Sequence, residues 1–89
     1  MEKIDQLRSE IDQIHVDMNR LFRQRLLLTQ KIWEIKKTEA MPFIDVDREQ
    51  KIIHRFDSEI SDQQEQMTVQ NFFKNILTET QIFLKAKLK

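Results

Sequence analysis

The sequence has no cysteine, no glycine and no tyrosine, and its only proline is Pro42. Without cysteine the chain can have no disulfide, no thiolate nucleophile and no cysteine-based metal site. Without glycine it lacks the loops that cradle phosphates and the residue that tight turns and β-bulges usually need. Because Leu, Ile, Lys, Glu and Gln dominate instead, the composition predicts an all-α fold.

The sequence also lacks an excess of charge of either sign and has no long apolar run. Fifteen basic and fifteen acidic residues cancel, so no net field attracts nucleic acid or an anionic membrane. The longest apolar runs, such as residues 26–28, are far too short for a signal peptide or a membrane span. We therefore expect a cytoplasmic protein without nucleic-acid or membrane partners, in which any anion site is local.

A heptad pattern of apolar residues is the strongest signal in the chain. Apolar side chains recur at steps of three and four, interrupted once at Arg25. The heptad seam consists of Ile4, Leu7, Ile11, Ile14, Met18, Leu21, Leu28, Ile32 and Ile35. The seam predicts a helix over about residues 4–38, roughly 50 Å long.

That helix is too long for a compact monomer of this size. A single domain of 89 residues, spanning 1–89, buries little surface and has a diameter of about 31 Å. The length of the first helix therefore favours an intertwined homodimer.

Two further helices are expected after the first. Pro42 cannot continue a helix, so residues 39–44 form a connection. A second helix begins near Asp45, the polar stretch 58–66 forms the second turn, and a third helix begins at about Met67.

Several polar residues lie where apolar ones are expected. Arg25 interrupts the seam, either as a structural ion pair, as a register-setting residue or as an anion ligand. Lys36 shares its helix face, and Glu49 shares the apolar stripe of the second helix. Thr80 interrupts the apolar face of the third helix. A hydroxyl at such a position commonly donates a hydrogen bond to the carbonyl of the preceding turn.

The sequence contains no motif typical of a metal or cofactor site. His15 and His54 lie on different predicted helices with no carboxylate or hydroxyl partner evident in the sequence. Asp45 and Asp47 alternate as in a calcium loop, but the glycine and the downstream glutamate of such a loop are absent. We expect no metal and no cofactor.

An ordered set of motifs resembles the all-helical chorismate mutase family over residues 4–56. It comprises LRSEIDQI at residues 7–14, then Arg25, Lys36 and Pro42, then DVDREQ at residues 45–50. The last third is similar through Phe73, Ile76 and Thr80, which have the spacing of the Phe, Ile and Ser of that family.

The resemblance implies an isomerase of the shikimate pathway, in aromatic amino acid biosynthesis. Such proteins convert chorismate to prephenate without a cofactor, as intertwined homodimers of three-helix protomers with two shared active sites. It implies that Arg25 and Arg48 bind substrate carboxylates in their own protomer's site, whereas Arg8 reaches the partner's site. Lys36 is implied to donate to the ether oxygen of the substrate.

The remaining implied site residues come from the second and third helices. Glu49 and the backbone near Asp45 are implied to hold the ring hydroxyl, and Thr80 replaces the family's serine. Four residues later the family has a Gln or Glu that makes a second contact with the ether oxygen, but here this position is Leu84. The departure predicts a slow enzyme unless Gln81 compensates.

The spacing of Arg8 and Arg25 on the first helix supports a shared site independently. Arg8 and Arg25 are seventeen residues apart, which is about 25 Å of helical rise. They cannot grip the same small ligand, so two copies of the site are needed if both bind substrate.

Two other functions stay open at this point. One is isochorismate-pyruvate lyase activity, which uses a similar fold and cationic pocket. The other is a non-catalytic or degenerate helical binding or regulatory module.

Overall fold

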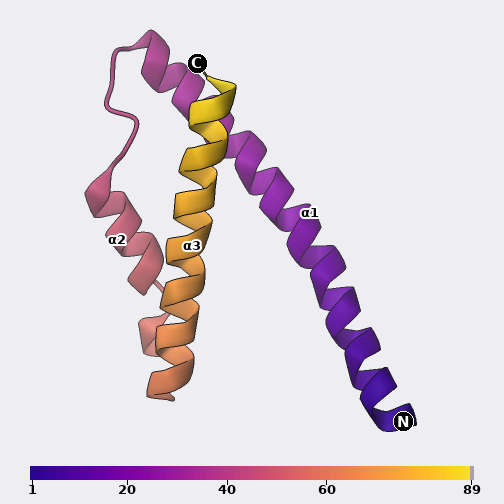
Figure 1. The fold of residues 1–89 in the computed structure, drawn as a ribbon. Helices are drawn as coiled ribbons and strands as arrows, with labels where there is room; N and C mark the ends of the chain where they lie inside the picture. The colour runs from indigo at the N-terminus through magenta and orange to yellow at the C-terminus, as the bar shows by residue number, and fades with distance from the viewer. Residues whose placement is uncertain (89) are drawn as a thin grey trace. The chain divides into compact units, whose positions relative to one another are not determined.

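The computed structural model describes residues 1–88, and the chain divides into two compact units, Met1–Lys31 and Ile32–Lys89. We call them the first unit and the second unit. The helices are α1 (Glu2–Thr38), α2 (Val46–His54), a short 3-10 helix η1 (Asp57–Glu59) and α3 (Gln63–Lys87), labelled α1 to α3 in Figure 1. Residues 1–88 include no β-strand, so the prediction of an all-α fold with three helices and a very long first helix is confirmed.

The first unit consists of helical backbone with an exposed apolar face. Glu2 and Asp5 lie in the first turn of α1, where the helix dipole favours negative charge. Seam residues of this unit remain about half exposed, with Leu7 at 53% and Ile14 at 55%. No residue of the first unit is buried.

Helix α1 ends within the second unit at a tight left-handed turn. Ala40 has a φ of 55°, a conformation that usually requires glycine. The Met41 N–H donates to the Lys36 carbonyl at 2.8 Å, and the Ala40 N–H donates to the Lys37 carbonyl at 3.4 Å. These paired bonds form a Schellman motif, which satisfies the last carbonyls of the helix and turns the chain toward Pro42.

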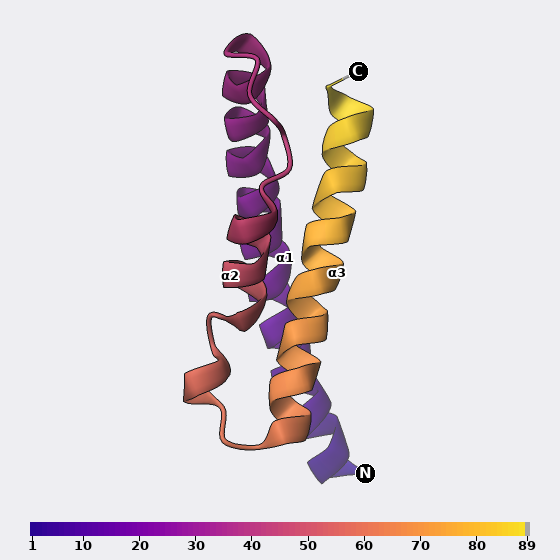
Figure 2. The same ribbon diagram turned by 90° about the vertical axis from the view of Figure 1, so that its left-hand side faces the viewer.

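Helix α2 begins one residue after the predicted start. The Asp45 carboxylate accepts from the Arg48 backbone N–H at 3.0 Å and caps the helix. Helices α2 and α3 pack side by side and run in opposite directions, as Figures 1 and 2 show. Ile53 is buried in this pair, and the rings of Phe56 and Phe73 stack with centroids 5.6 Å apart.

Helix α3 begins at Gln63, earlier than the predicted start at Met67. The Asp62 carboxylate accepts from the Glu65 backbone N–H at 3.0 Å, so the first turn is capped before any apolar residue appears. The prediction that 58–66 form a turn is therefore wrong for residues 63–66. The polar side chains of residues 63–66 favour a helix but carry no apolar periodicity.

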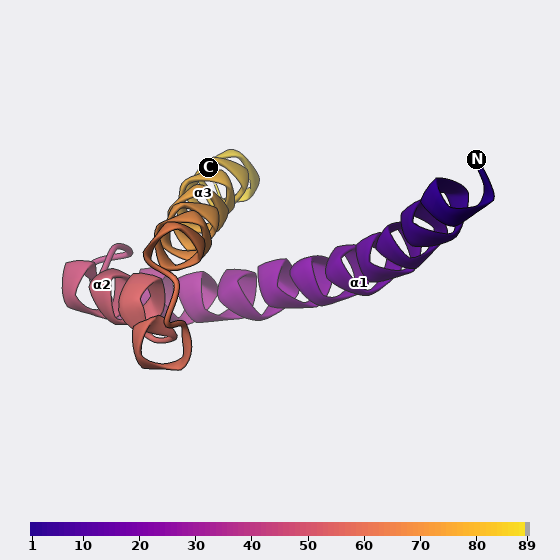
Figure 3. The same cartoon turned by 90° about the horizontal axis from the view of Figure 1, so that it is seen from below.

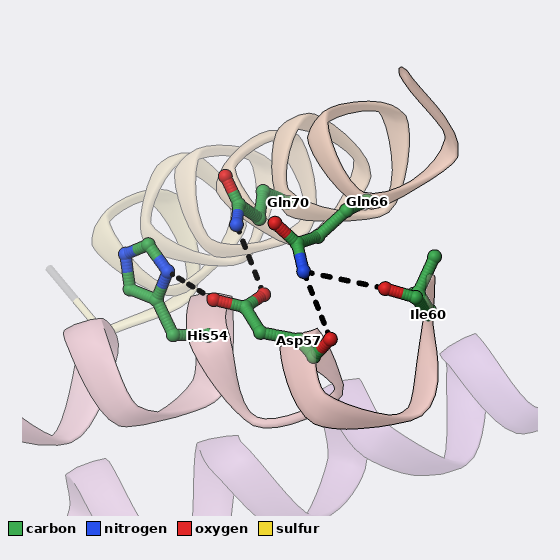
Figure 4. Close-up of polar contacts among 5 residues, drawn as sticks. All are labelled: His54, Asp57, Ile60, Gln66 and Gln70. Carbon is green, nitrogen blue, oxygen red and sulfur yellow. Dashed lines mark hydrogen bonds and ion pairs between the residues drawn. The ribbon is translucent and has the colours of Figure 1, made fainter. Parts of the chain in front are cut away.

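A polar cluster around Asp57, which we call the Asp57 clasp, holds the connection between α2 and α3 (Figure 4). The Gln70 amide donates to Asp57 Oδ1 at 2.9 Å, and His54 Nδ1 lies 3.0 Å from Asp57 Oδ2. The Gln66 amide donates to the backbone carbonyls of Asp57 at 2.8 Å and Ile60 at 3.4 Å. In Figure 3 this connection, with η1, lies in front of α2 and α3.

The Asp57 clasp corrects one prediction and perturbs one carboxyl group. No carboxylate partner was predicted for His15 or His54, but Asp57, three residues after His54, supplies one at 3.0 Å. On α1, the Asp12 carboxylate lies 4.0 Å from His15 Nδ1. The amide of Gln70, helped by His54 and opposed by partial desolvation, lowers the pKa of Asp57.

No helix in the described part of the chain, residues 1–88, has the length and apolar character needed to cross a membrane.

Candidate active site

An aromatic and aliphatic cluster forms the floor of the candidate site in the second unit. Trp33 on α1 stacks on Phe43 of the connection, with ring centroids 4.6 Å apart and planes 17° apart. Both rings line a pocket of about 420 Å³ together with Leu84 of α3. Trp33 and Leu84 are buried, so this pocket is anchored by residues with fixed positions.

Lys36 lies beside this pocket at the end of α1. Its ammonium donates to the Phe43 carbonyl at 3.1 Å, and the side chain is half-buried. An ammonium has three N–H donors. The bond to Phe43 therefore orients the group and leaves donors for the oxygen of a ligand.

Glu49 is held between α2 and α3 by a side chain from the opposite helix. The Gln81 amide donates to Glu49 Oε2 at 2.6 Å, and both side chains are half-buried. A carboxylate has two oxygens with about four lone-pair positions. Glu49 can thus bind Gln81 and still accept a hydrogen bond from a substrate hydroxyl.

Arg48 directly precedes Glu49 and Asp45 lies four residues before it, but the two side chains have separate structural roles. The side chain of Asp45 is occupied as the cap of α2 through the Arg48 N–H. The side chain of Arg48 is exposed and lines a different pocket, with Lys51, Arg55 and the ring of Phe73. The structure therefore does not bring Arg48 into the pocket that Leu84 lines.

Thr80 and Leu84 are the most deeply buried of the predicted site residues. The Thr80 hydroxyl donates to the Ile76 carbonyl at 2.6 Å, as expected from its position inside a helix. Its single O–H would have to leave Ile76 to donate to a substrate carboxylate. Leu84 is completely buried and contributes only apolar surface to its pocket.

Arg8 and Arg25 belong to the first unit. Arg8 is exposed and Arg25 is half-buried. The hydroxyl of Thr29 donates to the Arg25 carbonyl at 2.7 Å, an ordinary contact within one helix. The second unit thus contains Lys36, Asp45, Arg48, Glu49, Thr80 and Leu84, whereas Arg8 and Arg25 lie in the first unit.

The partner of Glu49 was not predicted from the sequence. Gln81 was expected only as a substitute for the missing polar residue at position 84. Gln81 follows Thr80 directly and lies on the α3 side that faces α2. The sequence signal was a polar residue within an apolar stretch of the third helix, which calls for a hydrogen-bond partner but does not name it.

The sequence model of the family described as chorismate mutase type II matches residues 7–82 of the chain. The matched range contains seven of the eight predicted site residues, from Arg8 to Thr80, whereas Leu84 lies just beyond it. Comparison with curated proteins and with solved structures gives no significant match.

Proposed function

The chain belongs to the chorismate mutase type II family, and on this premise we propose that it rearranges chorismate to prephenate in a site formed by the residues described above. The match over residues 7–82 is the observation that carries the proposal. The proposed cellular role is the chorismate step of aromatic amino acid biosynthesis, in the cytoplasm.

The chemistry suits the residues that the chain has. The rearrangement is unimolecular: the ether C–O bond breaks while a new C–C bond forms, and no atom enters or leaves. The enzyme must hold the enolpyruvyl arm over the ring and stabilise negative charge growing on the ether oxygen. Fixed cations and hydrogen-bond donors meet both requirements, and no nucleophile is required.

Each predicted residue has a defined part in this proposal. Lys36 donates to the ether oxygen, using N–H groups that its bond to the Phe43 carbonyl leaves over. Glu49 accepts a hydrogen bond from the ring hydroxyl, near the start of α2, which Asp45 caps. Thr80, when its hydroxyl leaves Ile76, donates to a carboxylate.

Three arginines bind the two substrate carboxylates. Arg25 and Arg48 serve the site of their own protomer, and Arg8 serves the site of the partner in a homodimer. Arginine suits this task because its planar fork binds a carboxylate through two hydrogen bonds and stays charged when buried. For Arg48 this requires its exposed side chain to turn from the neighbourhood of Lys51 and Arg55 toward the substrate.

The homodimer is part of the proposal because the first unit needs a partner. The seam residues of α1 are about half exposed, and a second copy of the same seam is the apolar surface that would cover them. A dimer with shared active sites also explains how two arginines about 25 Å apart on one helix can both bind substrate.

Leu84 makes the proposed enzyme a slow one. Its completely buried side chain offers no donor to the ether oxygen, so Lys36 is the only proposed side-chain donor there. Loss of one such preorganised donor typically costs about 10²–10³ in rate.

The decisive experiment is a direct assay of chorismate consumption with identification of the product. We expect prephenate, and a decrease of about 10²-fold or more in kcat for Lys36→Met. Lys37→Met is the matched control, because Lys37 is the exposed neighbour on the same helix turn.

Two outcomes would reject the proposed function. Turnover of isochorismate to pyruvate and salicylate, with none of chorismate, would make the chain a lyase. Tight binding of a prephenate-like dianion without any turnover would make it a binding or regulatory module.

A further inference from the structure

The hydrogen bond between Gln81 and Glu49 joins α3 directly to α2. The Gln81 Nε2 and Glu49 Oε2 atoms are 2.6 Å apart, and the residues are separated by 32 positions in the sequence. An amide N–H that donates to a carboxylate forms a charge-assisted bond, which is stronger than a bond between neutral groups. The contact therefore fixes one oxygen of Glu49 relative to α3.

We infer that Gln81 is a positioning residue, which orients the Glu49 carboxylate so that its other oxygen accepts the ring hydroxyl of the substrate. The inference rests on the proposed function. A half-buried glutamate has several rotamers, and a carboxylate held in one of them loses less entropy when substrate binds.

A direct contact between Gln81 and the ether oxygen is the competing role. It would have to use the second N–H of the amide, because the first donates to Glu49 Oε2 at 2.6 Å. Gln81 lies about one turn before position 84, where the family has its second donor, and about 60° away from it around α3. The bond to Glu49 is the contact that the structure shows, and it favours action through Glu49.

The positioning role has a consequence for specificity. If Gln81 acts through Glu49, its effect reaches only substrates that carry the ring hydroxyl. A site built to bind a hydroxyl discriminates strongly against an analogue without it, because its acceptor is then left unpaired. Loss of Gln81 should weaken this discrimination.

The test compares Gln81→Leu with wild type on chorismate and on a chorismate analogue that lacks the ring hydroxyl. We expect kcat/KM for chorismate to decrease about tenfold and kcat/KM for the analogue to change by less than about twofold. Gln64→Leu is the matched control, since it makes the same change at an exposed position of α3. Adding Glu49→Gln to Gln81→Leu should cause less loss than Glu49→Gln causes alone.

Three results would overturn the inference while leaving the proposed function intact. Equal losses on both substrates would show a structural role or a direct contact with the ether oxygen. Unchanged kinetics on both would show that the bond has no functional effect. Fully additive losses in the double variant would show that the two residues act independently.

A second measurement reports on the bond without catalysis. The side-chain amide protons of Gln81 should shift in NMR spectra of Glu49→Gln, and those of Gln64 should not. Absence of this shift would overturn the inference even if the kinetics agreed. A wild-type protein that turns over neither substrate would instead reject the proposed function itself.

Discussion

The two units of the chain differ in whether any of their apolar residues are buried. In the second unit Trp33, Ile53 and Leu84 are no more than 6% exposed, and they anchor a core between helices. In the first unit Leu7 and Ile14 remain more than half exposed, although they repeat as regularly as any core residues. The second unit thus buries part of its apolar side chains, while others, such as Ile35 at 56%, stay exposed as in the first unit.

This difference indicates which part of the chain has an apolar face without packing partners in its own unit. Isolated helices gain little stability in water, and most helical stability in proteins comes from packing of an apolar face. The second unit has such packing between α2 and α3, but the first has none within its own residues. We proposed above that a second copy of the chain supplies it.

The largest expected effect concerns the seam of the first unit. Ile14→Glu should dissociate the dimer and lower the free energy of unfolding by about 2–5 kcal/mol. Val16→Glu is a closely matched control, because Ile14 and Val16 are 55% and 58% exposed within the chain but only Ile14 belongs to the seam. It should have an effect of less than about 0.5 kcal/mol.

Sedimentation velocity and unfolding at several protein concentrations provide the measurement. The midpoint of unfolding should rise with concentration for wild type. Equal behaviour of the two variants, or a wild type that is a compact folded monomer at micromolar concentration, would contradict the dimer.

The next expected effect links the first unit to the partner's site. Arg8→Ala and Arg25→Ala homodimers should be nearly inactive, with losses of about 10²-fold or more. Refolding the two variants together should restore activity, because one site of the heterodimer collects both changes and the other none. Failure of heterodimers of confirmed composition to recover activity would argue against the shared site.

Local patterns were enough to predict much of the fold. The steps of three and four in the seam predicted α1, and Pro42 predicted the connection that follows it. The start of α3 was not predicted, because Gln63 to Gln66 are polar and only the cap at Asp62 marks the boundary. Apolar periodicity does not report a polar first turn.

The part of the candidate site that could not be predicted consists of contacts between residues far apart in the sequence. The bond between Gln81 and Glu49 depends on how α3 packs against α2, which no local spacing specifies. The pair of His54 and Asp57 is different, because a spacing of three residues places them one turn apart. That pair was predictable and was overlooked.

A smaller effect is expected from Leu84 in the core of the second unit. Leu84→Gln should raise kcat by about tenfold, less than the full value of a donor, because the new amide enters a pocket shaped for an apolar residue. It should also cost about 1–3 kcal/mol of stability, since the position is completely buried.

Steady-state kinetics and thermal unfolding of the same variant separate the two consequences. A gain in kcat larger than the change in KM would indicate a contact that strengthens in the transition state. A folded Leu84→Gln variant with unchanged kcat would show that the absent donor does not limit the rate.

The Asp57 clasp predicts how the second unit responds to acid. Because the pKa of Asp57 is lowered in the folded state, chiefly by Gln70, its contribution to stability is present above the carboxyl pKa of unfolded chains, about 4. That contribution is lost as the pH falls through the lowered folded-state pKa.

Gln70→Leu isolates this contribution from those of other carboxyl groups. The difference in unfolding free energy between wild type and variant should be largest above about pH 5 and should shrink toward pH 3. Denaturant titrations across this range measure it, with Gln64→Leu as the exposed control. A difference independent of pH would mean that the two side chains contribute only packing.

The smallest effect is expected at the end of α1, where Ala40 has a left-handed backbone. This conformation costs an L-residue about 1–2 kcal/mol relative to glycine, while glycine also adds entropy to the unfolded chain. Ala40→Gly should therefore stabilise the protein by about 0.5–1 kcal/mol. The only other alanine, Ala86, lies in the last turn of α3, and Ala86→Gly should destabilise it slightly. Denaturant unfolding at one fixed protein concentration compares the two, and a loss of stability in both would show that the turn at Ala40 carries no strain.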